Sequence, residues 1–144
     1  MYLLDTNVLS EMRKASRTKP SSAKMDRRVE KWVNSVSADE LYLSVVSILE
    51  LERGFHLLKQ KDPAQAEVIR TWVRSRVLPG FDGRILVVDL AIAQRCAALL
   101  IPSPIEYRDS LIAATALVHE MTVVTRNVCH FERTGAALLN PWDE

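Results

Sequence analysis

The 144-residue chain is poor in cysteine, glycine, proline and long apolar runs. Cys96 and Cys129 are too few for a disulfide framework, and no CxxC pair suggests a zinc site. Four glycines and six prolines exclude collagen-like and low-complexity chains. The longest uncharged apolar run, residues 41–49, is far shorter than the ~18 residues that span a bilayer. Because Asp5 also interrupts the apolar N-terminal stretch, we expect a soluble, cytoplasmic protein without a signal peptide or membrane segment.

What the chain does contain is an average globular composition, with 48% hydrophobic and 26% charged residues, which predicts one folded domain over residues 1–144. The net charge of +1 is unevenly distributed, since residues 13–31 hold eight basic and two acidic side chains. This segment is either a solvated face or a phosphate-binding flank on an otherwise acidic protein. Residues 13–25 lack periodicity and are expected to form a mobile loop between two helices.

Five short apolar runs alternate with segments of helical period. The runs are continuous, as in strands covered on both faces. The expected strands are residues 2–4, 41–45, 85–88, 122–124 and 137–139. The expected helices are residues 27–37, 48–58, 63–77, 93–100 and 111–118. This alternation predicts an α/β fold with a mainly parallel five-stranded sheet and helices on both faces.

Ligands bind such sheets at the carboxyl ends of the strands, where Asp5, Glu50 and Asp109 are expected to converge. Each acid also has a structural explanation: Asp5 as a helix N-cap, Glu50 in a capping box with Ser47 in the first turn of its helix, and Asp109 at a helix dipole. Three carboxylates at one edge repel each other unless a cation lies among them. Their hard oxygen ligands suit Mg²⁺ or Mn²⁺.

Five segments, in order along essentially the whole chain, give it a resemblance to the PIN-domain nucleases. They are residues 2–8 (YLLDTNV), 47–51 (SILEL), 109–116 (DSLIAATA), 125–131 (TRNVCHF) and 140–142 (NPW). The size and layout resemble the VapC-type toxins of toxin–antitoxin pairs most. The resemblance implies a PIN-like three-layer sandwich and a Mg²⁺- or Mn²⁺-dependent endoribonuclease. It also implies a homodimer, inhibition by a small antitoxin, and contact with DNA only through that antitoxin.

The resemblance also implies roles for individual residues. Asp5, Glu50 and Asp109 would be the metal-site carboxylates, supported by the polar side chains of Thr6, Asn7 and Asn127. The basic flank offers candidates for contacts to RNA phosphates, which are Arg13, Lys14, Arg17 and Lys19.

One position departs from the family pattern. Where the family has its fourth acid, this chain has His130. A neutral imidazole binds Mn²⁺ acceptably and Mg²⁺ poorly, so His130 is either a spare ligand or a replacement that weakens the site. If it abolishes the chemistry, the alternative is a binding module that acts as a partner subunit in an antitoxin- and DNA-bound complex. A haloacid-dehalogenase-type phosphatase is set aside, because it needs Asp-x-Asp where the chain has Asp5-Thr6-Asn7.

Overall fold

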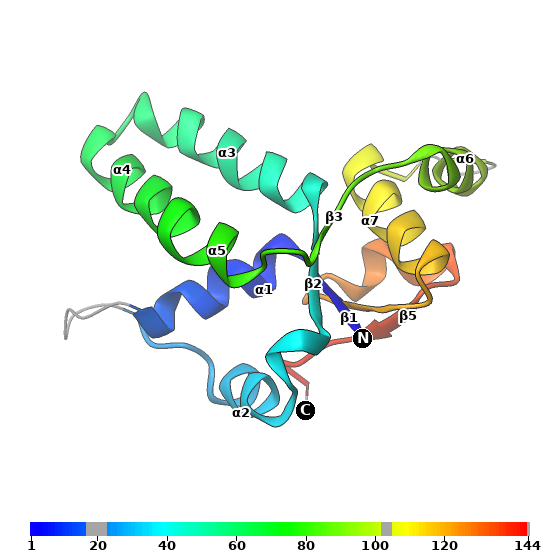
Figure 1. Cartoon of the computed structure of the whole chain (residues 1–144), viewed down its shortest axis with the longest axis horizontal. Helices are drawn as coiled ribbons and strands as arrows, with labels where there is room; N and C mark the ends of the chain where they lie inside the picture. Colours follow the sequence, from blue (N-terminus) through cyan, green and yellow to red (C-terminus); the bar gives the residue numbers. More distant parts are fainter. Residues whose placement is uncertain (17–22, 102–104, 144) are drawn as a thin grey trace.

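The computed structural model describes residues 1–16, 23–101 and 105–143, which form a five-stranded parallel sheet flanked by helices (Figure 1). The strand order is β3-β2-β1-β4-β5, and all four pairings are parallel. The strands are β1 (Tyr2–Leu4), β2 (Leu41–Ser44), β3 (Ile85–Leu86), β4 (Thr122–Val124) and β5 (Ala137–Leu139). The predicted α/β fold is confirmed, although β2 and β3 end earlier than expected because Val45 begins a helix and residues 87–88 leave the sheet.

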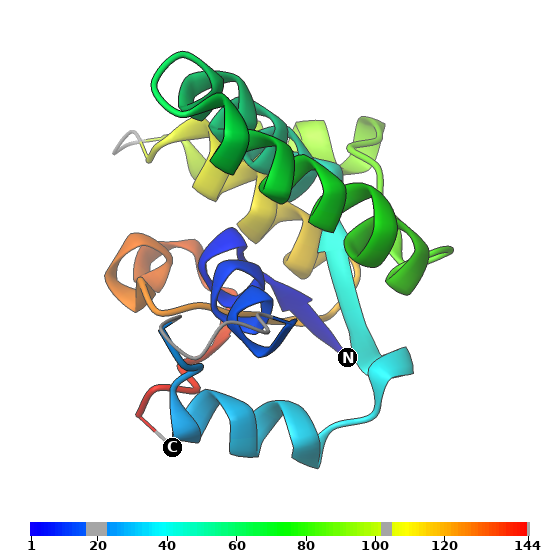
Figure 2. The same cartoon turned by 90° about the vertical axis from the view of Figure 1, so that its left-hand side faces the viewer.

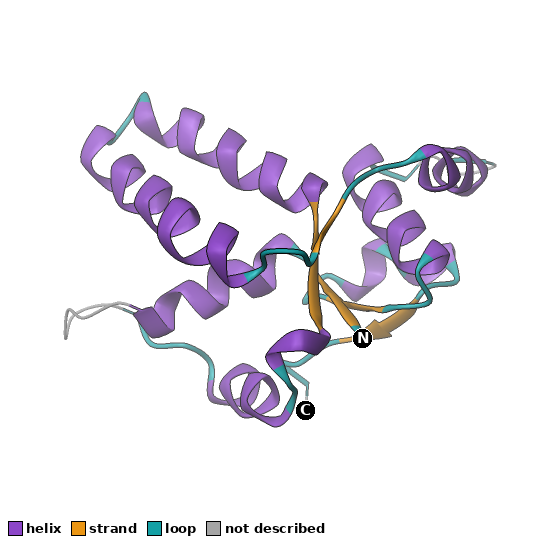
Figure 3. Ribbon diagram, viewed as in Figure 1, coloured by secondary structure: helices purple, strands orange, loops and turns teal. Residues whose placement is uncertain are grey.

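The helices fill the intervals between the strands (Figure 3). They are α1 (Thr6–Met12), α2 (Arg27–Ser35), α3 (Val45–Lys59), α4 (Pro63–Trp72), α5 (Leu78–Gly80), α6 (Leu90–Leu99) and α7 (Tyr107–Val118). A π-helical segment, Val73–Val77, joins α4 to α5. Of the expected mobile loop, Arg13–Ser16 forms a 3₁₀ turn and residues 17–22 lie outside the described residues.

Successive residues of β1 point to opposite faces of the sheet and belong to different cores. Leu4 packs with residues of α1, α2, α3 and the π-helical segment. Figure 2 shows α1 on this face, with α4 above it and α2 below. Leu3 packs on the other face against α7, and α6 covers the outer side of α7 through Ile92 and Cys96. The three layers explain why the strands are continuously apolar.

The connections at the carboxyl ends of the strands bring distant segments together. Asp5 follows β1 directly, and its backbone N–H continues the ladder by donating to the Val124 carbonyl at 3.0 Å. Thr125 follows β4 in the same way and donates to the Leu139 carbonyl at 3.0 Å. The first turn of α7 lies at this same edge, which is where the acidic residues meet.

Two further expectations concern cysteine and membranes. Cys96 is buried and Cys129 exposed, and both are free thiols. No helix within the described ranges is both long and apolar enough to cross a bilayer.

Candidate functional site

Asp5 is held by three hydrogen bonds at the end of β1. Its Oδ1 accepts from the Thr6 backbone N–H at 2.7 Å, so Asp5 is the N-cap of α1. Its Oδ2 accepts from Asn7 Nδ2 at 2.8 Å and from Thr125 Oγ1 at 2.7 Å. The residue is only 6% exposed. Asp5 therefore caps a helix and lies at the strand edge, and these donors fix the direction of its carboxylate.

Glu50 reaches the same edge from α3. Its Oε2 accepts a short hydrogen bond from Thr6 Oγ1, and its Oε1 lies 3.5 Å from Arg108 Nη1. Burial is the main cause that raises the pKa of Glu50, and the charges of Asp5 and Asp109 add to it.

The predicted capping box is wrong. The helix begins at Val45 and is capped by Ser44, whose Oγ accepts from the Val46 backbone N–H at 3.1 Å. Ser47 lies inside α3 and donates to the Leu4 carbonyl at 3.5 Å. Glu50 is thus in the second turn of the helix rather than the first, where its side chain is directed to the site.

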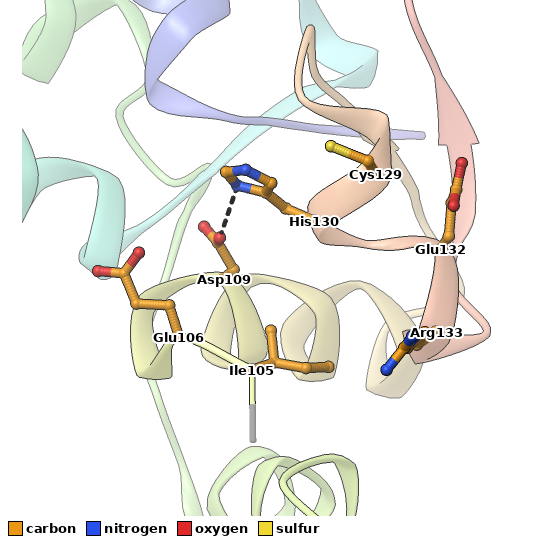
Figure 4. Close-up of a pocket in the computed structure, with 7 residues that line it drawn as sticks. All are labelled: Ile105, Glu106, Asp109, Cys129, His130, Glu132 and Arg133. Atoms are coloured by element: carbon orange, nitrogen blue, oxygen red, sulfur yellow. Dashed lines mark hydrogen bonds and ion pairs between the residues drawn. The ribbon is translucent and has the colours of Figure 1, made fainter. Parts of the chain in front are cut away.

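Asp109 occupies the first turn of α7, as the helix-dipole explanation expected, and its carboxylate faces His130. His130 Nδ1 lies 3.1 Å from Asp109 Oδ2 (Figure 4). Burial is the main cause that raises the pKa of Asp109, followed by the charge of Asp5, while His130 and Arg108 oppose the shift. The charge of Asp5 thus contributes to the raised pKa of both Asp109 and Glu50.

We expect Asp109→Asn to stabilise the metal-free protein at neutral pH by a few degrees in Tm, because the ionised carboxyl is disfavoured in the folded state. The folded protein holds this proton more tightly than the unfolded chain, so the penalty is complete above the raised pKa and disappears as the pH falls through it. Thermal melts in a chelator at several pH values should show the variant's advantage shrinking towards acid. An equal advantage at all pH values would contradict this origin.

The segment after β4 contributes His130, Asn127 and Thr125. His130 ends the 3₁₀ turn Val128–His130 and keeps half of its side chain exposed. Asn127 takes part through its backbone N–H, which donates to Thr125 Oγ1 at 3.0 Å. Asn7 Nδ2 also donates to Thr125 Oγ1, at 3.1 Å, and Asn7 Oδ1 accepts from the Arg126 N–H. Thr6 and Asn7 thus support the acids with their side chains, while Asn127 supports them with its backbone.

Two residues of the site were missed in the sequence. Thr125 carries a hydroxyl at the end of a strand and donates it to Asp5. A search of the strand ends for acidic residues alone does not find it. Arg108 is a cation directly before Asp109, and its Nε donates to Glu106 Oε1 at 2.7 Å while its Nη1 lies near Glu50. A basic residue next to a predicted acidic cluster is the signal that points to it.

Two side chains of the basic flank contact other residues of the protein outside the acidic cluster. The Arg13 guanidinium stacks over the Trp72 ring at 5.8 Å, and Lys14 pairs with the buried Glu11 at 2.7 Å. Arg17 and Lys19 lie outside the described residues. The part of these residues in binding RNA stays a prediction.

A hollow of about 530 Å³ opens beside Asp109 (Figure 4). It is lined by Ile105, Glu106, Asp109, Cys129, His130, Glu132 and Arg133. Within residues 1–16, 23–101 and 105–143, no three Asp, Glu, His or Cys side chains converge closely enough to share a metal ion as they lie. The carboxylates are turned to protein partners instead: Asp5 to its three donors, Glu50 to Thr6 and Arg108, and Asp109 to His130.

Fold and site together define an α/β protein with an acidic cluster at the carboxyl edge of a parallel sheet. The sequence model of the PIN-domain family matches residues 2–136, so the chain belongs to this family.

The chain is similar over nearly its full length to several named proteins and solved structures. It is 33% identical to the VapC ribonuclease Y4jK of Sinorhizobium fredii, with 99% of both chains covered. It is 34% identical to the toxin FitB of Neisseria gonorrhoeae, with 100% of both covered. The crystal structure of FitAcB from Neisseria gonorrhoeae matches at a TM-score of 0.83, with 34% identity and full coverage of both chains. A structure of FitAB bound to a DNA fragment matches at 0.82, with 34% identity over 99% of this chain and 96% of that one.

Proposed function

We propose that the protein is a metal-dependent endoribonuclease and the toxin of a toxin–antitoxin pair. The observation that carries the proposal is that Asp5, Glu50 and Asp109 lie at the same sheet edge, where burial first and then the charge of Asp5 raise the pKa of the Glu50 and Asp109 carboxyls. Such a cluster is unfavourable by itself and becomes favourable when a cation neutralises it. Among the relatives, the name VapC ribonuclease supports the ribonuclease activity and the name toxin FitB supports the toxin role.

The donor set fits Mg²⁺ or Mn²⁺, because all three acids offer hard carboxylate oxygens. The ion would be held by Asp5, Glu50 and Asp109. His130 would lie at the edge of this site, beside Asp109. Glu50 and Asp109 would exchange their present contacts with Arg108 and His130 for the ion. A bound ion would supply a water of lowered pKa for use as the nucleophile and would neutralise charge on the scissile phosphate.

The remaining residues position this machinery. Asn7, which lies in α1 after β1, and Thr125, which follows the neighbouring strand β4, both orient Asp5 by donating to its Oδ2. Thr6 does the same for Glu50 and is itself fixed in the first turn of α1 by the cap at Asp5. The hollow, which Asp109 and His130 line, would give an RNA strand access to Asp109 from solvent.

The partners follow from the relatives and are part of the proposal. The structure of FitAB bound to a DNA fragment supports contact of this protein with DNA as part of a complex. In the proposal, the partner in that complex is a small antitoxin, which alone would contact the DNA. The homodimer and the RNA substrate rest on the family resemblance stated from the sequence.

A cleavage assay tests the activity. Purified protein and single-stranded RNA are incubated with Mg²⁺, with Mn²⁺ or with a chelator, and Asp5→Asn controls for contaminating nuclease. Cleavage that needs metal and Asp5 supports the nuclease. An imidazole beside Asp109, at the position where the family has its fourth acid, favours a second candidate, which is a partner module with weakened chemistry. Antitoxin binding without cleavage at any metal concentration would favour that module.

The salt dependence of RNA binding tests the basic flank. Neutralising Arg13, Lys14, Arg17 and Lys19 together should flatten the slope of log affinity against log salt, because each contact to a single-stranded phosphate contributes about 0.7 to it. Loss of all four contacts would reduce the slope by roughly three, measured in a catalytically inactive background. An unchanged slope would mean that this flank is a solvated face with the structural contacts to Trp72 and Glu11.

A further inference from the structure

Arg108 brings a positive charge into the acidic site. The residue stands in the first turn of α7, directly before Asp109, with its side chain 37% exposed. Its Nη1 lies 3.5 Å from Glu50 Oε1, and its Nε and Nη2 both contact Glu106 Oε1. One guanidinium therefore bridges a carboxylate of α3 and the N-cap residue of α7.

The electrostatic effect of Arg108 is that expected of a cation in the site. Burial and the charge of Asp5 raise the pKa of Glu50 and Asp109, whereas the charge of Arg108 lowers both. Arginine stays protonated at all relevant pH values, so it neutralises the cluster whenever it is in place. Asp5, Glu50 and Asp109 do not converge closely enough to share an ion as the side chains lie, and the two oxygens of Glu50 face Thr6 and Arg108.

We infer that Arg108 is an internal counter-ion that competes with the divalent metal for Glu50, so that the Arg108–Glu50 contact opens when metal binds. The inference rests on the proposed function, since it takes the metal ion from there. Glu106 would retain the released guanidinium beside the site through its contact at 2.7 Å. The side chain would then change partners without leaving the rim of the hollow, which Glu106 lines.

Calorimetric titration of Mn²⁺ into the metal-free protein tests the competition. Arg108→Gln should bind Mn²⁺ on the order of three- to tenfold more tightly than the wild type, because a nearby positive charge and a competitor for Glu50 are both removed. Arg95→Gln removes the same charge from an exposed position of α6 and should leave the affinity unchanged. Arg108→Lys keeps the charge and should remain near the wild type, which also guards against misfolding of the glutamine variant.

A double-mutant cycle identifies Glu50 as the shared partner. In a Glu50→Gln background, Arg108→Gln should change the Mn²⁺ affinity much less than in the wild type. Thermal melts give an independent measurement: Arg108→Gln should melt lower than the wild type in chelator and gain more from saturating Mn²⁺.

The outcomes separate this inference from the proposed metal site. If the wild type binds Mn²⁺ and Arg108→Gln binds it with the same affinity, the counter-ion role is overturned while the metal site stands. If the wild type binds neither Mn²⁺ nor Mg²⁺, the metal site is overturned and the competition with it. Tighter binding by Arg108→Gln that persists fully in the Glu50→Gln background would also overturn the inference, because Glu50 would not be the contested ligand.

Discussion

Asp5→Asn is expected to reduce metal-dependent RNA cleavage by at least about a hundredfold, since the proposed metal site would lose the carboxylate that three hydrogen bonds hold in place. The asparagine keeps the N-cap, because its side-chain oxygen can still accept from the Thr6 N–H. Its amide group, however, would face Asn7 Nδ2, a donor that now points at Asp5 Oδ2 from 2.8 Å. We therefore expect the folded protein to persist with a loss of about 1–3 kcal/mol in the free energy of unfolding.

Cleavage is measured alongside urea denaturation of both proteins, so that lost activity and lost stability are told apart. Asp62→Asn is the matched control, since Asp62 caps α4 at the far end of the α3–α4 hairpin and accepts from the Gln65 N–H at 3.1 Å (Figure 1). It should leave cleavage unchanged. Substantial cleavage by Asp5→Asn would remove Asp5 from the metal site.

His130→Asp is expected to strengthen Mg²⁺ binding by about tenfold and to raise cleavage at millimolar Mg²⁺, because it adds a fourth hard anionic ligand. The wild type should prefer Mn²⁺ over Mg²⁺ more strongly than the variant does, since Mn²⁺ tolerates nitrogen ligands better. The position is suitable because His130 Nδ1 already lies 3.1 Å from Asp109 Oδ2. Without metal, the new carboxylate would repel Asp109, so the variant should also melt lower in chelator.

Titrations of Mg²⁺ and Mn²⁺ by calorimetry, with RNA cleavage followed in parallel, measure both effects. His56→Asp makes the same substitution at an exposed position of α3 and should alter neither metal affinity. Identical isotherms and rates for His130→Asp and the wild type would place residue 130 outside the cation site, leaving Asp5, Glu50 and Asp109 to act alone.

Most of the fold follows from patterns that tertiary contacts reinforce. The five apolar runs became the five strands, and in the three central ones, β1, β2 and β4, the apolar side chains are mostly buried by helices on both faces of the sheet. The boundary at Val45 was wrong because a β-branched pair, Val45 and Val46, has the composition of a strand. Ser44 still pairs with Leu86 and then caps α3, and this pairing, invisible in the local sequence, decides where the helix begins.

The position of the three acids at one sheet edge could be predicted, because Asp5 follows β1 and the helices that carry Glu50 and Asp109 begin at the same edge. Their role as metal ligands stays a prediction. Their partners could not be predicted, because these depend on side-chain directions from elements far apart in the chain. Thr6 bonds to Glu50 across 44 positions, and Thr125 bonds to Asp5 across 120. The π-helical segment was missed for a different reason: a period of 3.6 was assumed throughout residues 63–77, and Val73–Val77 departs from it.

The sheet ends at two short strands, which limits how other chains can join it. In the described part of the chain, one edge is β3, with two residues, and the other is β5, with three. A polypeptide that aligned itself along either edge would form only a few backbone hydrogen bonds before the template ended. Association of the folded protein with another chain through a shared β-sheet would therefore be weak at either of these edges. Selectivity for another protein must come from side-chain shape and charge on the helical surfaces.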